Sequence, residues 1–460
     1  MSLNESVTES DAKFNRMTTR PVRKLVCEMA VPSIVIMLVS TMYNAADTWF
    51  VSSIGTSATA AIGVSFSLMA VIQAIGFLFG HGSGNFISRA LGARRQEEAA
   101  KMAANGFFTS FILGVIITGI GIFFLTPLAR LLGSTETILP FAREYLFFIL
   151  IGAPFAIASF MLNHLLRFQG SAFFGMIGMV SGAILNICLD PLFIFVFDMG
   201  VSGAGLATMI SQTASCALLF WGCTQGGNIS VKLRNFSPAA TLYKEMLRGG
   251  MPSLLRQSMI ALGALFMNHA AAGYGDAAIA AITIVNRIVM LSIAGVLGFG
   301  QGFQPVCGFN YGAKRYDRVK TAFRFCVTLS TAALTVLAIL CFIFAPEVVA
   351  LFRKDDPGVI SIGAFMLRAQ CLSLPVVSWT LMLNMMLQTI GKAFQANVLA
   401  FARQGLFLIP LLFILVPLFG VTGIQICAPI SDFCIFLLSI PLGIPVMRKM
   451  IDVVSLNESQ

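Results

Sequence analysis

Long apolar segments alternate with short polar segments along the whole chain. A helix needs about 20 predominantly apolar residues to cross the hydrocarbon core of a membrane. Segments of this kind are separated by Gly, Pro or clusters of charge, and they are centred near residues 40, 72, 112, 153, 184, 212, 260, 292, 333, 376, 407 and 434. The pattern therefore predicts about twelve membrane-spanning helices.

The composition agrees with this prediction. Of the 460 residues, 57% are hydrophobic and only 11% are charged, whereas soluble domains carry about 25% charged residues. So few charges cannot cover a water-facing surface, and we expect an all-α integral membrane protein. The polar stretch before the first span lacks the short apolar core and cleavage site of a secretory signal, so we expect this span to be retained.

The two halves of the chain repeat each other at a distance of about 220 residues. The matched pairs include Pro32 with Pro252, Gly55 with Gly275, Gly82 with Gly302, Arg95 with Arg315 and Gly200 with Gly420, and, one residue out of step, Asn163 with Asn384. Aligned Pro and Gly over both halves are not expected by chance. Because six spans fall in each half, both copies have the same orientation, which predicts two six-helix lobes related by a pseudo-twofold axis along the membrane normal.

The breaks in this pattern give five regions. We expect a cytoplasmic N-terminal segment at 1–25, an N-lobe at 26–226, a cytoplasmic linker between the lobes at 227–249, a C-lobe at 250–447 and a cytoplasmic tail at 448–460. A duplicated and very hydrophobic protein is most simply a transporter, because two similar halves can rock about a central site.

The net charge of +10 is distributed unevenly. Lys and Arg are concentrated in the N-terminal segment, in the loops after the second and eighth spans, and between the halves, while the opposite side carries only Arg130, Arg353 and Lys354. The positive-inside rule then places both termini in the cytoplasm. The basic excess is explained by topology and contact with anionic lipids, so nucleic acid is not an expected partner.

Several chemistries are not expected. The ten Cys are scattered without a C-x-x-C pair or zinc-ligand spacing, so we expect no bound metal beyond a possible Na⁺. The chain has no phosphate-binding loop of the G-x-x-x-x-G-K-[ST] type, so ATP is not the expected energy source. No Ser or Cys nucleophile context stands out either, and we expect neither an enzyme nor a cofactor.

Two acids lie inside predicted spans of the first half. A charge at the bilayer centre costs about 2.5–3.5 kcal/mol on insertion scales, so Asp47 and Asp190 need an explanation. Asn186 lies four residues before Asp190, on the same helix face, and Asn163 and Thr208 add an amide and a hydroxyl. The second half lacks this set of acids.

Two interpretations of these acids are open. A buried Asp can pair with Arg or mark a helix break, and Pro191 follows Asp190 directly. The functional interpretation is a cation site. A carboxyl group in a low-dielectric pocket is harder to ionise and can exchange a proton near working pH, and amide and hydroxyl oxygens are suitable ligands for Na⁺.

Other candidates come mostly from the second half. Asp432, together with Arg256, Arg287 and Arg403, either forms a buried ion pair or lines a pathway. An adaptable substrate cavity or ordinary packing would both explain the Met-rich segment near residue 384. The substrate-cavity candidates are Asn44, Met382, Asn384, Met385 and Met386.

The chain resembles the MATE family of multidrug and toxic compound extrusion transporters, in its DinF-like and MepA-like branch. The resemblance covers nearly the whole chain and is carried by NAADTWF in the first span, ISRALGA after the second, and NICLDPLFIFVFDMGVSGAGLATMIS across the fifth and sixth. It implies two six-helix lobes in a V around a central cavity. The family's first-lobe cation site corresponds here to Asp47, Asn163, Asn186, Asp190 and Thr208.

The resemblance also implies a function. We expect a secondary active antiporter that exports lipophilic, often cationic, drug-like compounds in exchange for H⁺ or Na⁺. We expect it as a monomer in contact with lipids, in the inner membrane of a bacterium. Some relatives carry coupling acids in their seventh, eighth or tenth helices, and this chain has none in those helix interiors. The alternatives are a flippase for a lipid-linked or amphiphilic metabolite and a membrane-embedded receptor.

Overall fold

The computed structural model describes residues 3–353 and 356–458, with side chains except at 3–10, 44 and 451–458. Every regular element in these ranges is helical, as the sequence predicted. The contacts divide the chain into two compact units. The first contains residues up to Arg20 together with Val31–Gly250, and the second contains Pro21–Ala30 together with the residues from Met251 onward.

The first unit begins with a helix in the polar segment for which no helix was predicted, α1 (Leu3–Thr19). The other elements that lie wholly or partly in this unit are α2 (Val22–Ser52, from Val31 onward), α3 (Thr56–Gly92), α4 (Gln96–Phe123), α5 (Leu125–Leu131), α6 (Leu139–Phe168), α7 (Ala172–Pro191), the π-helical turn η1 (Leu192–Val196), α8 (Gly200–Gly222), the 3₁₀ turn η2 (Leu233–Asn235) and α9 (Ala240–Ala272, up to Gly250).

The second unit has the same plan. Its elements are α9 (Ala240–Ala272, from Met251 onward), α10 (Asp276–Gly312), α11 (Tyr316–Ile343), α12 (Ala345–Ala350), α13 (Pro357–Thr389), α14 (Ala393–Phe401), the π-helical segment η3 (Ala402–Leu408), α15 (Ile409–Phe419) and α16 (Val421–Glu458). The repeat is visible in helix length, because α3 and α10 both have 37 residues and α4 and α11 both have 28.

The repeat is also visible in the backbone. Gly170 and Gly391 have φ of 81° and 84°, and Gly200 and Gly420 have φ of 56° and 59°. Positive φ is accessible to Gly at little cost because it has no Cβ. The aligned glycines thus form equivalent turns in both halves, which explains why these residue types recur at a fixed spacing.

Eleven helices of the described residues are long and apolar enough to cross a membrane. They include the span Ala172–Val196, which joins α7 to η1, and Ala393–Phe419, which joins α14, η3 and α15. The remaining predicted segment, near residue 260, lies in α9. This helix is 33 residues long but carries Arg256 and Gln257 within its apolar stretch, which lowers its hydropathy.

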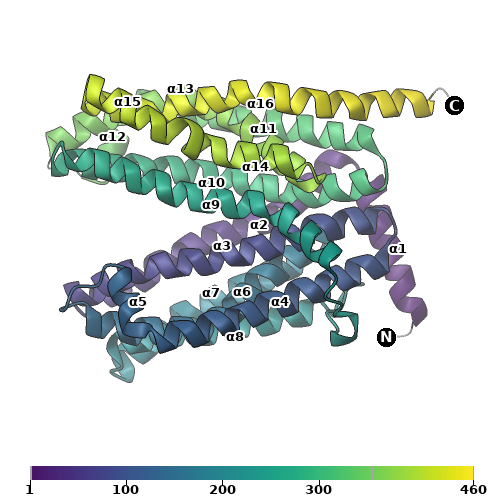
Figure 1. Cartoon of the computed structure of the whole chain (residues 1–460), viewed down its shortest axis with the longest axis horizontal. Coiled ribbons are helices and arrows are strands. Elements are labelled where there is room, and N and C mark those ends of the chain that lie inside the picture. The colour runs from purple at the N-terminus through teal and green to yellow at the C-terminus, as the bar shows by residue number, and fades with distance from the viewer. Residues whose placement is uncertain (1–2, 354–355, 459–460) are drawn as a thin grey trace. The chain divides into compact units, whose positions relative to one another are not determined.

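One helix is central to each unit. In the first unit α6 contacts α3, α4 and α8, and in the second α13 contacts α10, α11 and α16. The helices of each unit lie alongside one another in Figure 1. In the most apolar 18-residue stretch of α6, 72% of the residues are buried inside the protein, against 22% in the corresponding stretch of α4. A polar residue on α6 is therefore placed where protein, not lipid, surrounds it.

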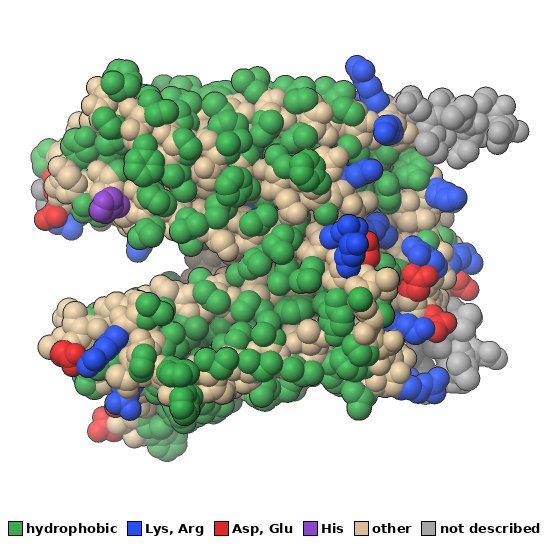
Figure 2. Space-filling view, viewed as in Figure 1, with side chains coloured by type: hydrophobic (Ala, Val, Ile, Leu, Met, Phe, Trp, Pro, Cys, Tyr) green, Lys and Arg blue, Asp and Glu red, His purple; other side chains and the backbone are tan. Residues whose placement is uncertain are grey.

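The surface of each unit is apolar over its length and charged at its ends. Figure 2 shows hydrophobic side chains covering the middle of both units, with most Lys and Arg gathered at one end. In the first unit this end carries the N-terminus of the chain, and in the second the C-terminus (Figure 1). An apolar band between charged ends is the surface expected of a protein that spans a bilayer.

Candidate functional site

A cavity of about 360 Å³ lies inside the first unit. Its walls come from α2, α3, α6, α7 and α8, and most are apolar. The polar residues that line it are Ser40, Tyr43, Gln73, Ser159, Asn186, Thr208, Ser211, Gln212 and Ser215. A mainly apolar pocket with a few polar groups is a typical binding site for a small molecule.

Asn186 connects this cavity to the first buried acid. Its Nδ2 donates to Asp190 Oδ1 at 3.4 Å and lies 3.3 Å from Thr208 Oγ1. The first bond is possible because residues four apart lie on one face of α7. Asn186 and Thr208 line the cavity, while Asp190 is 0% exposed behind them. The structure therefore brings these three predicted site residues together.

The second buried acid is held by a residue that the sequence argument missed. The Tyr145 hydroxyl donates to Asp47 Oδ2 at 3.2 Å, and both side chains are buried. Tyr145 comes from the central helix α6 and also interacts with Thr208. Asp47 and Asp190 act on each other electrostatically. Tyr145 thus links Asp47 on α2 with the Asn186 group on α7 and α8.

Three oxygen atoms in this group have no hydrogen-bond partner among the described residues. They are Asp47 Oδ1, Asn186 Oδ1 and Asp190 Oδ2. A buried polar atom without a partner costs about 1–3 kcal/mol, and more when it is charged. Oxygens with spare acceptor capacity are also the ligands that a proton or a hard cation requires. The arrangement is chemically suited to taking up a monovalent cation.

Asn163 is not part of this group, although the family resemblance placed it there. Its Oδ1 lies against Gly175, near the beginning of α7, where a Cβ would approach it to 3.2 Å. Gly175 and Asp190 are fifteen residues apart on this helix, which corresponds to about 22 Å at 1.5 Å per residue. The length of α7 therefore separates Asn163 from the two acids.

The substrate-cavity candidates Met382, Asn384, Met385 and Met386 are not among the residues that line this cavity. Met382, Met385 and Met386 are buried on α13, and the first two lie against Gly300 of α10. Asn384 donates through Nδ2 to the Ala396 carbonyl at 2.8 Å and accepts from Arg256 at 3.5 Å. The side chain of Asn44 lies outside the described residues. A role for these five residues in substrate binding stays a prediction.

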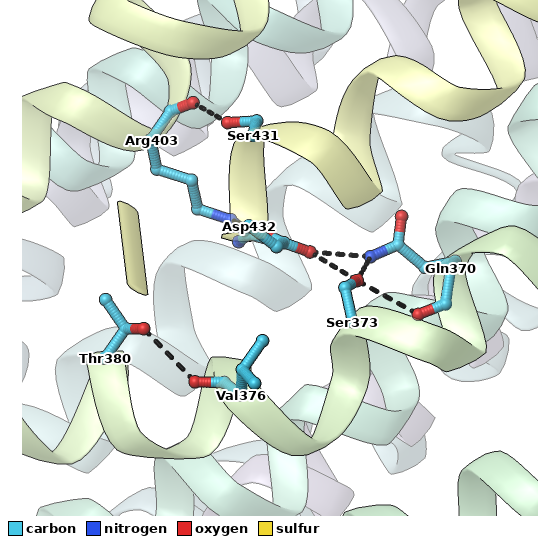
Figure 3. A network of polar contacts seen from close by, with 7 residues as sticks. All are labelled: Gln370, Ser373, Val376, Thr380, Arg403, Ser431 and Asp432. Atoms are coloured by element: carbon cyan, nitrogen blue, oxygen red, sulfur yellow. Dashed lines mark hydrogen bonds and ion pairs between the residues drawn. The ribbon is translucent and has the colours of Figure 1, made fainter. Parts of the chain in front are cut away.

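The second unit contains a different kind of buried acid, which Figure 3 shows from close by. Asp432 on α16 is 1% exposed and forms an ion pair with Arg403 of η3, whose Nε donates to Oδ1 at 2.7 Å. Its Oδ2 accepts from Gln370 Nε2 at 2.8 Å and from Ser373 Oγ at 2.9 Å. The buried ion pair that the sequence offered as one interpretation of Asp432 is therefore present.

Two histidines that are far apart in the sequence lie together in the first unit. The rings of His81 and His164 are 4.2 Å apart between centroids, and Arg167 Nη2 lies 2.6 Å from His164 Nδ1. The residues come from α3 and α6, which the sequence alone does not bring together. No group of three or more His, Cys, Asp or Glu in the described part of the chain is arranged to hold a metal ion.

The comparisons with known proteins give the family. The profile of the MatE family matches residues 32–192 and 252–414, so it matches each half of the repeat separately. The chain belongs to the MATE family. The multidrug export protein MepA of Staphylococcus saprophyticus is 30% identical over 427 residues, which cover 91% of this chain and 94% of that protein. MepA of Staphylococcus aureus strain MRSA252 is 29% identical over 429 residues.

Solved MATE structures have the same fold. One, described as the outward-facing conformation of a multidrug resistance MATE family transporter, has a TM-score of 0.86 at 29% identity and covers 94% of this chain and 99% of its own. A MATE structure in a straight conformation has a TM-score of 0.88 at 28% identity and covers 95% of this chain and 98% of its own. This MATE protein is therefore a multi-pass membrane transporter, not an enzyme, and its two units are called the N-lobe and the C-lobe below.

Proposed function

We propose that this MATE protein exports varied lipophilic, drug-like compounds in exchange for H⁺ or Na⁺. Its similarity to proteins described as multidrug exporters supports the direction of transport and the class of cargo. The observation that carries the ion coupling lies in the N-lobe. There, Asp47 and Asp190 each have a buried oxygen without a partner, beside a cavity large enough for a small organic molecule.

The coupling site consists of the two acids, of Asn186 and Tyr145, which bond to them, and of Thr208, which bonds to Asn186. Asp47 and Asp190 supply the charge, Asn186 and Thr208 supply oxygens at the cavity wall, and Tyr145 holds Asp47. The two carboxyl groups interact, so they take up and release the ion as a pair. Asn163 is not included in this set, because α7 separates it from Asp190.

Binding of the cation and binding of the drug exclude each other in this scheme. In the outward-open state a cation enters from outside and neutralises the acids, which removes the charge that holds a cationic drug in the cavity. Loss of this charge also allows α2 to bend near Pro32, which cannot donate the usual helix hydrogen bond. In the inward-open state the ion leaves and a new drug molecule enters.

The available energy is sufficient for useful export. Each charge that crosses the full membrane potential supplies about 2.3 kcal/mol per 100 mV. For an uncharged compound, one or two ions per cycle therefore support a substrate gradient of between one and several orders of magnitude, since each factor of ten requires about 1.4 kcal/mol. A compound with one positive charge leaves against the same potential, which offsets the contribution of one incoming charge. The ion gradient, and not ATP, is the energy source in this proposal.

The distribution of charge supports one orientation. Lys and Arg gather at one end of each lobe (Figure 2), and this end carries a chain terminus (Figure 1). By the positive-inside rule this end faces the cytoplasm, so both termini are cytoplasmic in the plasma membrane of the cell.

The test is transport by the purified full-length protein in liposomes, with the pH gradient and the Na⁺ gradient varied independently. Rhodamine 123, a lipophilic cationic dye, is a suitable cargo. We expect uphill movement of the dye with one of the two gradients and none in liposomes without protein. Dye movement that is indifferent to both gradients would contradict the antiport mechanism. Movement of lipid-linked sugars, but not of dye, would favour the flippase.

A further inference from the structure

We propose that Arg403 in the C-lobe is a recognition site for a carboxylate group on the exported compound. This inference rests on the proposed export function and deepens it. It assigns to the C-lobe a ligand chemistry opposite to that of the N-lobe acids.

The first support is the position of Arg403 in the repeat. Repeat shifts of 220 and 221 residues place the N-lobe cavity residues Ala183 and Gly182, respectively, on Arg403. The shift of 220 also places the cavity residue Gln212 on Asp432, and the shift of 221 places the cavity residue Ile149 on Gln370. Arg403, Asp432 and Gln370 therefore occupy positions that form the wall of a small-molecule cavity in the other lobe, with charged and amide groups in place of mostly small or apolar ones.

The second support is the way in which the guanidinium group is held. Asp432 is fixed by three donors at 2.7–2.9 Å, from Arg403, Gln370 and Ser373 (Figure 3). Ser431 donates to the backbone carbonyl of Arg403, which lies in the π-helical segment η3. Interruptions of this type in α-helices are frequent at functional sites. Both the backbone and the side chain of Arg403 are thus held in place before any ligand arrives.

The third support is the set of donors that remains available. The only side-chain hydrogen bond of Arg403 within the described residues is the one from Nε to Asp432, and the side chain is 28% exposed. An Arg presents five N–H donors in a planar fork. The Nη1 and Nη2 atoms therefore keep their four N–H groups for a ligand. A carboxylate matches this geometry, because its two oxygens accept two parallel N–H bonds.

The depth of Arg403 in the membrane excludes a lipid headgroup as the ligand. The residue lies ten positions after the start of the 27-residue span Ala393–Phe419, which is about 15 Å along the helix at 1.5 Å per residue. The hydrocarbon core is about 30 Å thick, so Arg403 lies near its middle. Ionisable residues at this depth commonly mark the pathway of a substrate or an ion. Because Asp432 already has its full set of donors, the substrate pathway is the better assignment.

The experiment compares two dyes that differ in one group. Rhodamine 110 has a free carboxylate and is zwitterionic, whereas rhodamine 123 is its methyl ester and carries only the positive charge. Binding of each to purified full-length protein is measured by fluorescence anisotropy. In the Arg403→Lys variant, the positive charge beside Asp432 is kept but the planar fork is lost. We expect rhodamine 110 to bind about tenfold more weakly, because one charge-assisted bidentate contact is removed, and rhodamine 123 to be unchanged.

The matched control is Arg368→Lys on α13, since Arg368 is another C-lobe arginine within a span and its Nε donates to the Phe342 carbonyl. This variant should leave the binding of both dyes unchanged. The proposal is overturned if Arg403→Lys weakens both dyes equally, if it weakens neither, or if the wild-type protein binds the ester and not the free acid. The proposed export function is tested separately, by gradient-driven export of rhodamine 123. A negative result in the binding experiment can therefore be distinguished from a negative result in the export experiment.

Discussion

Asp190 in the N-lobe and Asp432 in the C-lobe are both buried carboxylates, and the two are stabilised very differently. Asp190 is 0% exposed and Asp432 is 1% exposed, so burial does not distinguish them. Asp190 accepts one long hydrogen bond, from Asn186 at 3.4 Å, and its Oδ2 has no partner among the described residues. Asp432 accepts three bonds of 2.7–2.9 Å, one of them from an arginine. The supply of donors, and not depth, separates the two acids.

This difference has a chemical consequence. A buried carboxylate without enough donors is costly until a cation reaches it. A carboxylate that is paired with Arg and fully hydrogen-bonded is compensated at all times, and removal of its partner is what becomes costly. One duplicated scaffold therefore holds an acid suited to ion exchange in the N-lobe and a fixed charge pair in the C-lobe. The predictions below test this contrast, from the largest expected effect to the smallest.

Replacement of Asp190 should have the largest effect on transport. In Asp190→Asn the site loses one of its two charges, so we expect uphill dye export to fall to the level of liposomes without protein. With 100 mV imposed, each charge that no longer crosses removes about 2.3 kcal/mol of driving free energy. The melting temperature in detergent should not fall, because the change removes a poorly compensated buried charge. Export at the wild-type rate would contradict the assignment.

Replacement of Asp432 should lower the stability of the protein, in contrast to replacement of Asp190, which should abolish export without lowering stability. Asp432→Asn leaves Arg403 without its anion, so we expect the free energy of unfolding to decrease. Breaking a fully buried pair costs about 3–5 kcal/mol, and the partial exposure of Arg403 reduces this to about 2 kcal/mol. The check is thermal unfolding in detergent, with Asp190→Asn measured beside it. If Asp432→Asn were as stable as wild type and had lost the ion dependence of export, the roles of the two lobes would be reversed.

Removal of the Tyr145 hydroxyl should alter the affinity for the coupling ion. In Tyr145→Phe, Asp47 loses a donor at 3.2 Å, which is worth about 1 kcal/mol. The less compensated carboxylate binds a cation more tightly, so we expect the ion concentration for half-maximal export to decrease about fivefold. Initial rates of dye export over a series of ion concentrations provide the measurement. An increase in that concentration would show that Tyr145 does not act on Asp47.

Replacement of Asn163 should have the smallest effect. Asn163→Ala removes an amide that the family resemblance assigns to the cation site and that the structure places about 22 Å from Asp190 along α7. Distant sites behave independently, so the ion dependence of export should stay within about twofold of wild type. Asn186→Ala, which removes the residue bonded to Asp190, serves as the comparison and should change it strongly. Equal effects of the two variants would restore Asn163 to the site.

The fold could be predicted from the sequence because its signals are local or periodic. Apolar segments gave the spans, and Gly and Pro at a fixed spacing gave the duplication, which the family match at 32–192 and 252–414 confirms. The prediction of spans was weakest where polar residues interrupt an apolar segment. The segment near residue 260 is a helix, but Arg256 and Gln257 leave it below the hydropathy of the other eleven spans.

The candidate site could be predicted only in part. Asn186 and Asp190 are four residues apart on one helix, so helical periodicity alone places them together. Tyr145 was not among the predicted site residues, and only tertiary structure shows that its hydroxyl reaches Asp47. The only sequence feature that could have drawn attention to Tyr145 is that the chain has just six Tyr. Likewise, the sequence named Asp432 and Arg403 but could not show that two helices bring them to 2.7 Å.

The most direct test removes both N-lobe acids at once. The Asp47→Asn, Asp190→Asn double variant should be reconstituted in liposomes beside the wild type, and export of rhodamine 123 measured with an imposed gradient of the coupling ion. The account predicts that the double variant, with the C-lobe pair intact, still allows dye to equilibrate downhill but never concentrates it. Accumulation of dye against its gradient by this variant would show that the driving ion binds elsewhere.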